Sequence, residues 1–328
     1  MKQLRKKALL PALSMALASV IALSGVTYAW FTTSPTASVT GMDVNVKAAN
    51  GIQISLDART WKSTISSADI KDFIDGRDAA VYPGAVNQFP DGSPISEGGE
   101  GIEIMPVSSA GNVVDGKLAM FYGEIDKQGK LTTTAEAEAD RINGGNFIAF
   151  DLFINNTVDK DQPLKLDKVG DLSKVAASTA FNGNDNAKAE TAVRVAFIYQ
   201  GNVAAGNYKG AWDLNGGTSA VIWEPNSKIH PVGVVDANGD APSTTSKTPY
   251  NGVKAAFTAK DLDKLSDAEV SAVETFDETK DIITLKPGIN KVRIYIWLEG
   301  QDVDCVNQIS YGDFVTNLSF SVPEIAEG

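Results

Sequence analysis

The sequence has almost none of the side chains that build disulfides, zinc sites and nucleophile–base pairs. It contains one cysteine, Cys305, and one histidine, His230. One cysteine excludes an intramolecular disulfide, so a stable fold must depend on a large apolar core, in which we expect Cys305 to be buried. One histidine excludes zinc sites that need two or three histidines, including the His-Glu-x-x-His arrangement of metallopeptidases.

Sequence motifs of catalysis are absent as well. The chain has no Gly-x-Ser-x-Gly nucleophile turn, no phosphate-binding glycine loop and no Rossmann fingerprint. A cysteine nucleophile would need Cys305 beside His230, and nothing in the sequence brings them together. Carboxylate pairs of the glycosidase type cannot be recognised, because spacing along the chain does not give their separation. We therefore expect a protein that is not an enzyme.

Two acidic clusters resemble calcium ligand sets, namely Asp236, Asn238 and Asp240, and Glu299, Asp302 and Asp304. In the first cluster the sixth loop position is Ala241 rather than glycine, and the twelfth is Lys247 rather than glutamate. We therefore expect a turn at the first cluster, with calcium as the alternative at both. No other cofactor is indicated.

The charge balance of the chain is acidic. It has 41 Asp and Glu residues against 29 Lys and Arg residues, and its formal net charge is −12. Such a charge repels nucleic acids and anionic membrane surfaces, so no nucleic-acid partner is expected. It favours solubility at high concentration and association with cationic partners.

The N-terminus has the pattern of an export signal. Basic residues near the start precede an apolar run over Ala8–Val26, and the small-residue end Thr27-Tyr28-Ala29 follows. This pattern predicts a signal peptide over residues 1–29, cleaved between Ala29 and Trp30, and a secreted protein. As a helix, residues Ala8–Ala29 would also span roughly 33 Å, about one bilayer core, so an uncleaved membrane anchor is the alternative. Cleavage would leave roughly 300 residues, enough for one large domain or two ordinary ones.

Apolar and polar residues alternate along the predicted strands. From Met42 to Leu56 the apolar side chains fall on even positions, which places one strand face on a core and the other in water. Runs rich in Val, Ile and aromatic residues predict further strands at Phe147–Ile154, Ala192–Tyr199, Lys291–Leu298 and Asn317–Val322. Short helices are expected at 67–74, 134–140 and 259–273. The pattern favours an all-β antiparallel sandwich with loop and short-helix insertions.

The first residues after the predicted cleavage site differ from the rest of the chain. Residues 30–41 are rich in Ser and Thr, and no charge occurs before Asp43. Because they are uncharged, β-prone and terminal, they form either a flexible N-terminal arm or a strand that pairs with an exposed sheet edge. We expect one sandwich domain over 42–328 to follow this arm, with insertions at about 58–145 and 200–280 that leave a second domain open.

The junction at the end of the export signal, Gly25–Phe31, resembles that of the TasA/camelysin group of exported proteins. Further similar segments are two Pro-Gly turns, a strand ending in Asn and two longer stretches, at Val81–Gly84, Leu285–Gly288, Phe150–Asn156, Asn50–Trp61 and Val292–Asp304. The resemblance implies a jelly-roll sandwich, cleavage by a signal peptidase of the endoplasmic-reticulum type, and a secreted subunit of extracellular fibres in a biofilm matrix or surface layer. Some members are labelled metallopeptidases, and the single histidine argues against that activity here.

The leading hypothesis is a non-enzymatic homopolymer subunit that assembles head to tail by donor-strand complementation. A terminal segment of one copy fills an unfilled strand position in the next, through main-chain hydrogen bonds and alternate side-chain pockets. Trp30 and Phe31 are expected to anchor the arm, Ala37 and Val39 to occupy pockets, and Gly41 to allow the turn into the first strand of its own domain. Other components of the extracellular matrix or cell surface are further expected partners.

The alternative hypothesis is a membrane-anchored cell-surface adhesin or carbohydrate-binding sandwich. Trp61, Trp212 and Trp223 lie in polar, glycine-containing surroundings of the kind that a sugar-stacking platform uses. Large aromatic residues also anchor sandwich cores, so we expect these three to pack in the core or under loops.

Overall fold

The computed structural model consists mainly of β-strands, so the all-β prediction is confirmed. The structure describes residues 37–46, 51–75, 102–125, 131–136, 146–166, 189–223, 281–300 and 312–323, together with residues 225, 302 and 305. The predicted signal peptide, the first residues of the arm and the helix expected at 259–273 lie outside these residues.

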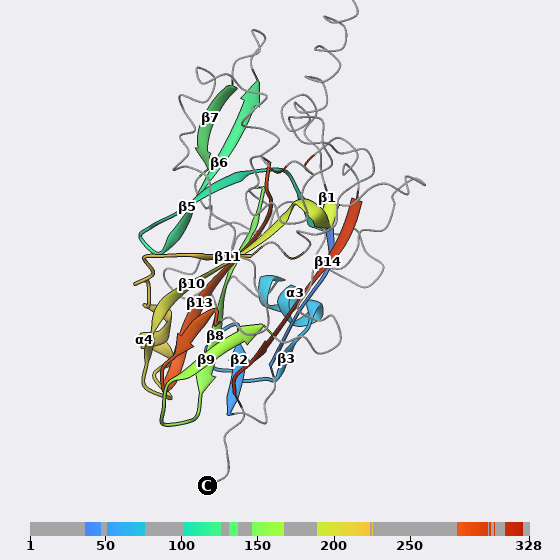
Figure 1. Cartoon of the computed structure of the whole chain (residues 1–328). Coiled ribbons are helices and arrows are strands. Elements are labelled where there is room, and N and C mark those ends of the chain that lie inside the picture. The colour runs from blue at the N-terminus through green and yellow to red at the C-terminus, as the bar shows by residue number, and fades with distance from the viewer. Residues whose placement is uncertain are drawn as a thin grey trace, which may run out of the picture.

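The strands form two main sheets and one smaller sheet (Figure 1). The first sheet has the order β12 (Ile283–Leu285), β9 (Gln162–Leu166), β14 (Gly312–Ser321), β1 (Ala37–Val46) and β3 (Thr64–Ile65), and β4 (Ile102–Ile104) also pairs with β1. The second has the order β11 (Val221–Trp223), β10 (Val193–Val203), β13 (Gly288–Leu298), β8 (Ile148–Asn156) and β2 (Ile52–Ser55). The small sheet contains β5 (Ser108–Val114), β6 (Lys117–Ile125) and β7 (Leu131–Glu136). Within the described ranges, the helical segments are α3 (Ser67–Asp75), η4 (Ala189–Ala192) and α4 (Tyr208–Trp212).

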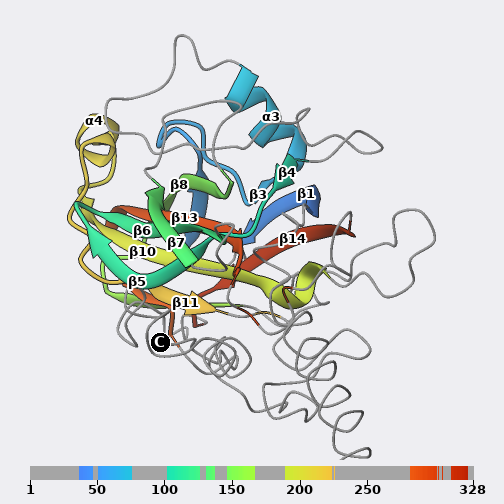
Figure 2. The ribbon, with the colours of Figure 1, turned by 90° about the horizontal axis from the view of Figure 1, so that it is seen from above.

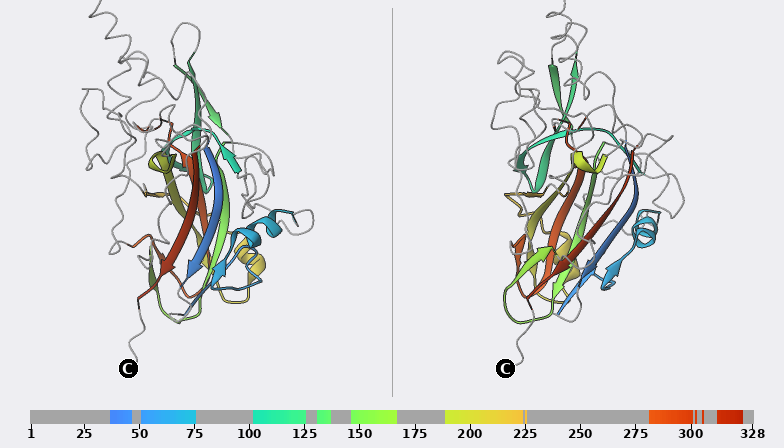
Figure 3. Two further views of the ribbon diagram at one scale, coloured as in Figure 1. Left: turned by 90° about the vertical axis from the view of Figure 1, so that its right-hand side faces the viewer. Right: turned by 45° about the vertical axis from the view of Figure 1, so that its right-hand side comes forward.

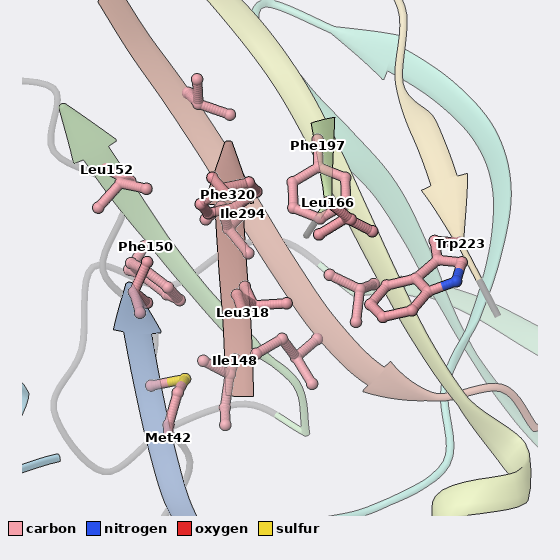
Figure 4. Close-up of a cluster of buried hydrophobic side chains, with 14 of the residues drawn as sticks. Met42, Ile148, Phe150, Leu152, Leu166, Phe197, Trp223, Ile294, Leu318 and Phe320 are labelled. Carbon is pink, nitrogen blue, oxygen red and sulfur yellow. The ribbon is translucent and has the colours of Figure 1, made fainter. Parts of the chain in front are cut away.

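The two main sheets enclose the largest apolar core. Met42 and Phe320 from the first sheet and Phe150 and Phe197 from the second point into the same space (Figure 4). The rings of Phe197 and Phe320 pack edge to face, with centroids 5.9 Å apart. Cys305 belongs to this core and is buried, as predicted. Because the chain has one cysteine, apolar burial takes the place of disulfides in holding the sheets together.

The strands expected from the sequence are present. The four Val-, Ile- and aromatic-rich runs correspond to β8, β10, β13 and β14, and the alternating segment corresponds to β1 and β2. In β1, Met42 and Val44 are fully buried while Asp43 and Asn45 are half-buried, which is the alternation that a half-buried strand requires. The chain bends at Pro287 and enters β13 at Gly288. Gly288 has φ of 97°, and a Cβ there would lie 2.3 Å from the carbonyl oxygen of Val203, so only glycine fits.

The sequence predicts the short helices less well than the strands. α3 begins at Ser67, as expected. The helical turn expected at 134–140 is wrong, because residues 131–136 form β7 and pair regularly with β6. Three consecutive threonines, Thr132–Thr134, explain the difference: β-branched side chains lose rotamer freedom in a helix and fit a strand that has a partner.

The sandwich is not purely antiparallel. β1 and β14 run parallel, from the pair Ala37 and Gly312 to the pair Val46 and Phe320. The antiparallel expectation is therefore wrong for this pair. Short hairpin loops force neighbouring strands to be antiparallel, but β1 and β14 are the first and last described strands and no short loop fixes their direction.

The outer face of the second sheet carries buried charges. On β13, Lys291 and Arg293 alternate with core residues and are fully buried, and Asp151 on neighbouring β8 lies against both. Arg293 donates to Asp151 through Nε at 2.8 Å and Nη2 at 3.3 Å, and Lys291 Nζ lies 3.3 Å from Asp151 Oδ2. One carboxylate therefore stabilises two buried cations.

The same two cations fasten two loops to the sheet. Lys291 donates to the carbonyl oxygens of Trp212 (3.0 Å) and Leu214 (2.9 Å). Arg293 donates to the carbonyl oxygen of Gly116 at 2.9 Å, in the turn between β5 and β6, and Figure 2 shows those strands beside β10 and β13. Burial lowers the pKa of Lys291; Asp151 opposes this effect and Arg293 adds to it.

Replacing Asp151 by alanine is expected to destabilise the fold strongly. The change leaves two cations buried without their carboxylate, which costs about 3–5 kcal/mol. The matched control is Asp161→Ala, which breaks the half-exposed ion pair with Lys286 and is expected to cost less than about 1 kcal/mol. Urea unfolding measures both changes. Equal losses in the free energy of unfolding would contradict the stabilisation of Lys291 and Arg293 by Asp151.

Candidate assembly site at the N-terminal half of β1

The first residues of β1 lie in a slot between two other strands. Ala37, Ser38 and Val39 pair in parallel with residues 312–314 of β14 and antiparallel with residues 102–104 of β4. Figure 3 shows β1 in blue alongside β14 in red over most of their length. Both backbone edges of this half-strand therefore have partners, one from each side of the slot.

The side chains in the slot divide into an inner and an outer set. Ala37 and Val39 are 1% and 0% exposed and belong to the main core, together with Ile104 and Phe314. Ser38 faces the other way and is half-buried. The two residues expected from the sequence to occupy pockets are thus buried, and in this single chain the pockets are its own.

A bulge separates this half of β1 from the rest of the strand. The register with β14 shifts between Val39 and Gly41. The turn expected at Gly41 is not found, because β1 continues through this residue to Val46. Gly41 has a different reason to be glycine: a Cβ would lie 3.0 Å from Cγ1 of Val315 on β14, closer than side chains normally approach. Close strand contact, rather than a turn, accounts for this position.

Other residues assigned to assembly lie outside the described part of the chain. Ala29, Trp30 and Phe31 are among them, so the predicted cleavage point and the aromatic anchor have no described position. The site therefore consists of Ala37–Val39 and the strands that flank them.

The three tryptophans of the alternative hypothesis do not form one platform. Trp223 is 6% exposed and lies in the main core (Figure 4). Trp61 and Trp212 pack together with Tyr208 on a smaller cluster, where the Tyr208 and Trp212 rings lie 5.1 Å apart, edge to face. The guanidinium of Arg59 covers the Tyr208 ring at 5.3 Å. Core and loop packing therefore describes these residues, as expected.

The loop before Trp61 contains a feature that the sequence analysis missed. Asp57 Oδ1 accepts hydrogen bonds from the backbone N–H groups of Arg59 (2.8 Å) and Thr60 (2.7 Å) and from the hydroxyl of Ser55 (2.8 Å). Ala58 adopts the left-handed conformation, with φ of 57°. Burial raises the pKa of Asp57, but these hydrogen bonds outweigh it and the pKa lies below its ordinary value. The signal for such a loop is an Asp followed by small and polar residues.

A shallow pocket of about 140 Å³ adjoins this loop. Its lining is apolar at Leu56, Ile65 and Phe73, and polar at Ser55, Asp57, Thr60, Lys62 and Asp69. The ammonium of Lys62 pairs with Asp69, and both residues line the pocket. The polar groups of the pocket thus satisfy one another.

The acidic clusters have other uses or no described position. Asp302 forms a buried ion pair with Arg194, and Glu299 accepts a hydrogen bond from the indole N–H of Trp297 at 3.1 Å. Asp304 and the cluster that begins at Asp236 lie outside the described residues. Across the ranges that the structure describes, no three His, Cys, Asp or Glu side chains gather closely enough to hold a metal ion.

In the described part of the chain, no helix is long and apolar enough to cross a membrane. Comparison with protein-family models, curated proteins and solved structures finds no match to this chain.

The Asp57 loop predicts a pH dependence of stability. Because the folded state lowers the pKa of Asp57, its contribution is complete above the ordinary value of 3.8 and is lost as the pH falls through the folded-state value. Asp57→Asn is expected to cost about 1 kcal/mol at pH 7, since the carboxylate is half-exposed and solvent weakens its interactions. The difference from the unchanged protein should shrink below about pH 4 in urea unfolding. The exposed Asp159→Asn is the control, and a constant difference at all pH values would contradict the account.

Proposed function

We propose that this protein is a secreted, non-enzymatic structural subunit of an extracellular fibre, in which the N-terminal segment of each copy fills the slot between β4 and β14 of the next. The supporting observation is the burial of Ala37 and Val39 between these strands, in the first described strand and next to the last described one. The fibre belongs to a biofilm matrix or surface layer, as in the TasA/camelysin group that the export junction resembles.

The contacts in the slot suit exchange between copies. They consist of main-chain pairing on both edges and two small apolar side chains in the core. A second copy of the same segment can make all of these contacts unchanged, so exchange costs little. Because a head-to-tail contact of this kind does not close on itself, it propagates into a filament.

Removal of the signal peptide is part of this proposal. A signal peptidase of the endoplasmic-reticulum type cleaves between Ala29 and Trp30, and the freed segment then begins with Trp30 and Phe31, which anchor it in the neighbouring copy. The finer fold assignment, a jelly-roll sandwich, belongs here as well. It is supported by two sheets around one core with the first and last described strands adjacent.

The carbohydrate-binding alternative has less support. Trp223 is in the core, the indole N–H of Trp212 donates to the carbonyl oxygen of Asp57 at 2.9 Å, and Arg59 covers Tyr208. These aromatic side chains are already engaged within the fold, which leaves little ring surface for a sugar.

Val39→Lys is expected to abolish assembly of the chain that begins at Trp30. A lysine ammonium in the slot is buried without a partner, at a cost of about 3 kcal/mol or more, so the segment fills neither its own slot nor another. Ser38→Lys is the matched control, because this half-buried position lies opposite Glu103 and beside Asp313. Negative-stain microscopy should show filaments for the control only, with circular dichroism confirming that both variants are folded.

Mixing the Val39→Lys chain with the unchanged chain tests the same substitution in a second way. A folded Val39→Lys chain can accept a segment from an unchanged chain but cannot donate one, so it should shorten filaments when added as a minor component. Filaments of Val39→Lys that match those of Ser38→Lys would overturn the proposed function.

A further inference from the structure

The two halves of β1 are held by different kinds of contact. The N-terminal half, Ala37–Val39, pairs with β14 and β4, and its two buried side chains have no hydrogen-bonding groups. The C-terminal half, Gly41–Val46, pairs with β14 and β3 and lies against the start of α3. If the segment exchanges between copies, the strand has to part somewhere, and this difference indicates where.

A polar clamp ties the C-terminal half to α3. The backbone N–H of Met42 donates to Oγ of Ser67 at 2.9 Å, and the backbone N–H of Ser67 donates to Oδ1 of Asp43 at 2.9 Å. A carboxylate at the first N–H groups of a helix satisfies an otherwise unpaired donor and interacts favourably with the helix dipole. We define Asp43 and Ser67 as the α3 clamp.

The start of α3 is itself firmly held. Ser66 and Asp69 cap one another: the Ser66 N–H donates to Asp69 Oδ2 at 3.0 Å, and the Asp69 N–H donates to Ser66 Oγ at 3.3 Å. Ile70 packs into the main core. Nearby, the Val46 N–H donates to the carbonyl oxygen of Ser63 at 2.8 Å, beside the β3 pairing. The clamp therefore fastens β1 to a rigid part of its own fold.

The bulge lies directly between the clamped and the unclamped half. The ladder between β1 and β14 is interrupted from Val39 to Gly41, so a change of direction there breaks fewer hydrogen bonds than one inside either half. Glycine at position 41 also allows backbone angles that other residues resist.

We infer that the bulge between Val39 and Gly41 is the hinge of strand exchange, and that the α3 clamp keeps Gly41–Val46 in its own subunit. This inference rests on the proposed function and names the part of the chain that is exchanged. The partner is a second copy of this chain, which supplies the residues up to Val39 and no further. Asp43 and Ser67 are positioning residues, because they act through β1 rather than on the exchanged segment.

Two pairs of introduced cysteines show which half of β1 is exchanged between copies. Ser38 and Glu103 face each other in the β1–β4 pairing, and Asn45 and Thr64 do so in the β1–β3 pairing. All four positions are half-buried or exposed, and directly opposed residues of antiparallel strands have Cβ atoms about 4.5–5.5 Å apart, close enough to cross-link after a small adjustment. Both double variants, S38C/E103C and N45C/T64C, carry Cys305→Ala as well, so that no other thiol is present.

Oxidised filaments, dissolved in denaturant and separated under non-reducing conditions, give three distinct outcomes. S38C/E103C ladders of covalent multimers together with N45C/T64C monomers support the inference. Multimers from both pairs show that all of β1 is exchanged, which overturns the hinge and leaves the proposed function intact. Cross-linked monomers from both pairs show that no exchange occurs, which overturns both.

A Ser67→Ala change tests the clamp itself. Loss of the hydrogen bond from the Met42 N–H to Ser67 Oγ is expected to raise the fraction of N45C/T64C multimers about fivefold, because more of β1 then leaves its subunit. Asp72→Asn, an exposed position on the same helix, is the control and should leave the fraction unchanged. A merely structural role for Ser67 would lower the amount of folded protein without changing this fraction, and that result would overturn the clamp.

Discussion

The parallel contact between β1 and β14 is the interaction on which the first sheet depends. Within the described residues, β14 pairs with β9 only at Phe320 and Ser321, whereas β1 accompanies it from Gly312 to Phe320. Without the first half of β1, the backbone groups of residues 312–314 would lose their partners and the core around Phe314 would open. The first sheet is therefore complete only with a strand in this slot, but the chemistry of the slot does not require that strand to come from the same chain.

Polar side-chain contacts hold other parts of the sandwich together. Buried charges on the second sheet, Lys291, Arg293 and Asp151, tie surface loops to the strands through specific hydrogen bonds. The α3 clamp does the same for the second half of β1. The slot at Ala37–Val39, by contrast, is held by main-chain pairing and small apolar side chains. In the proposed fibre, this contrast distinguishes the part of the sandwich that stays in its own subunit from the segment that a second copy supplies.

Much of the sheet structure was predictable. β1 and β2 alternate apolar and polar residues, and runs rich in Val, Ile and aromatic residues indicate the more fully buried strands β8, β10 and β13. The bulge in β1 was not predictable, since Gly41 was expected to make a turn. Contacts between distant residues left no local signal. Asp43 and Ser67 lie 24 positions apart, and the charges on β13 occupy positions that look exposed in the sequence. Contacts of this kind can be identified only once it is known which strands pair with which.

The most direct test of the central claim uses two chains that each carry one cysteine, in a Cys305→Ala background. Chains with S38C are mixed with chains that carry E103C, assembled, and oxidised. The account predicts a disulfide between the two kinds of chain, because Ser38 of one copy then lies beside Glu103 of the next. Filaments that form normally but contain no such disulfide would contradict strand exchange as the basis of assembly.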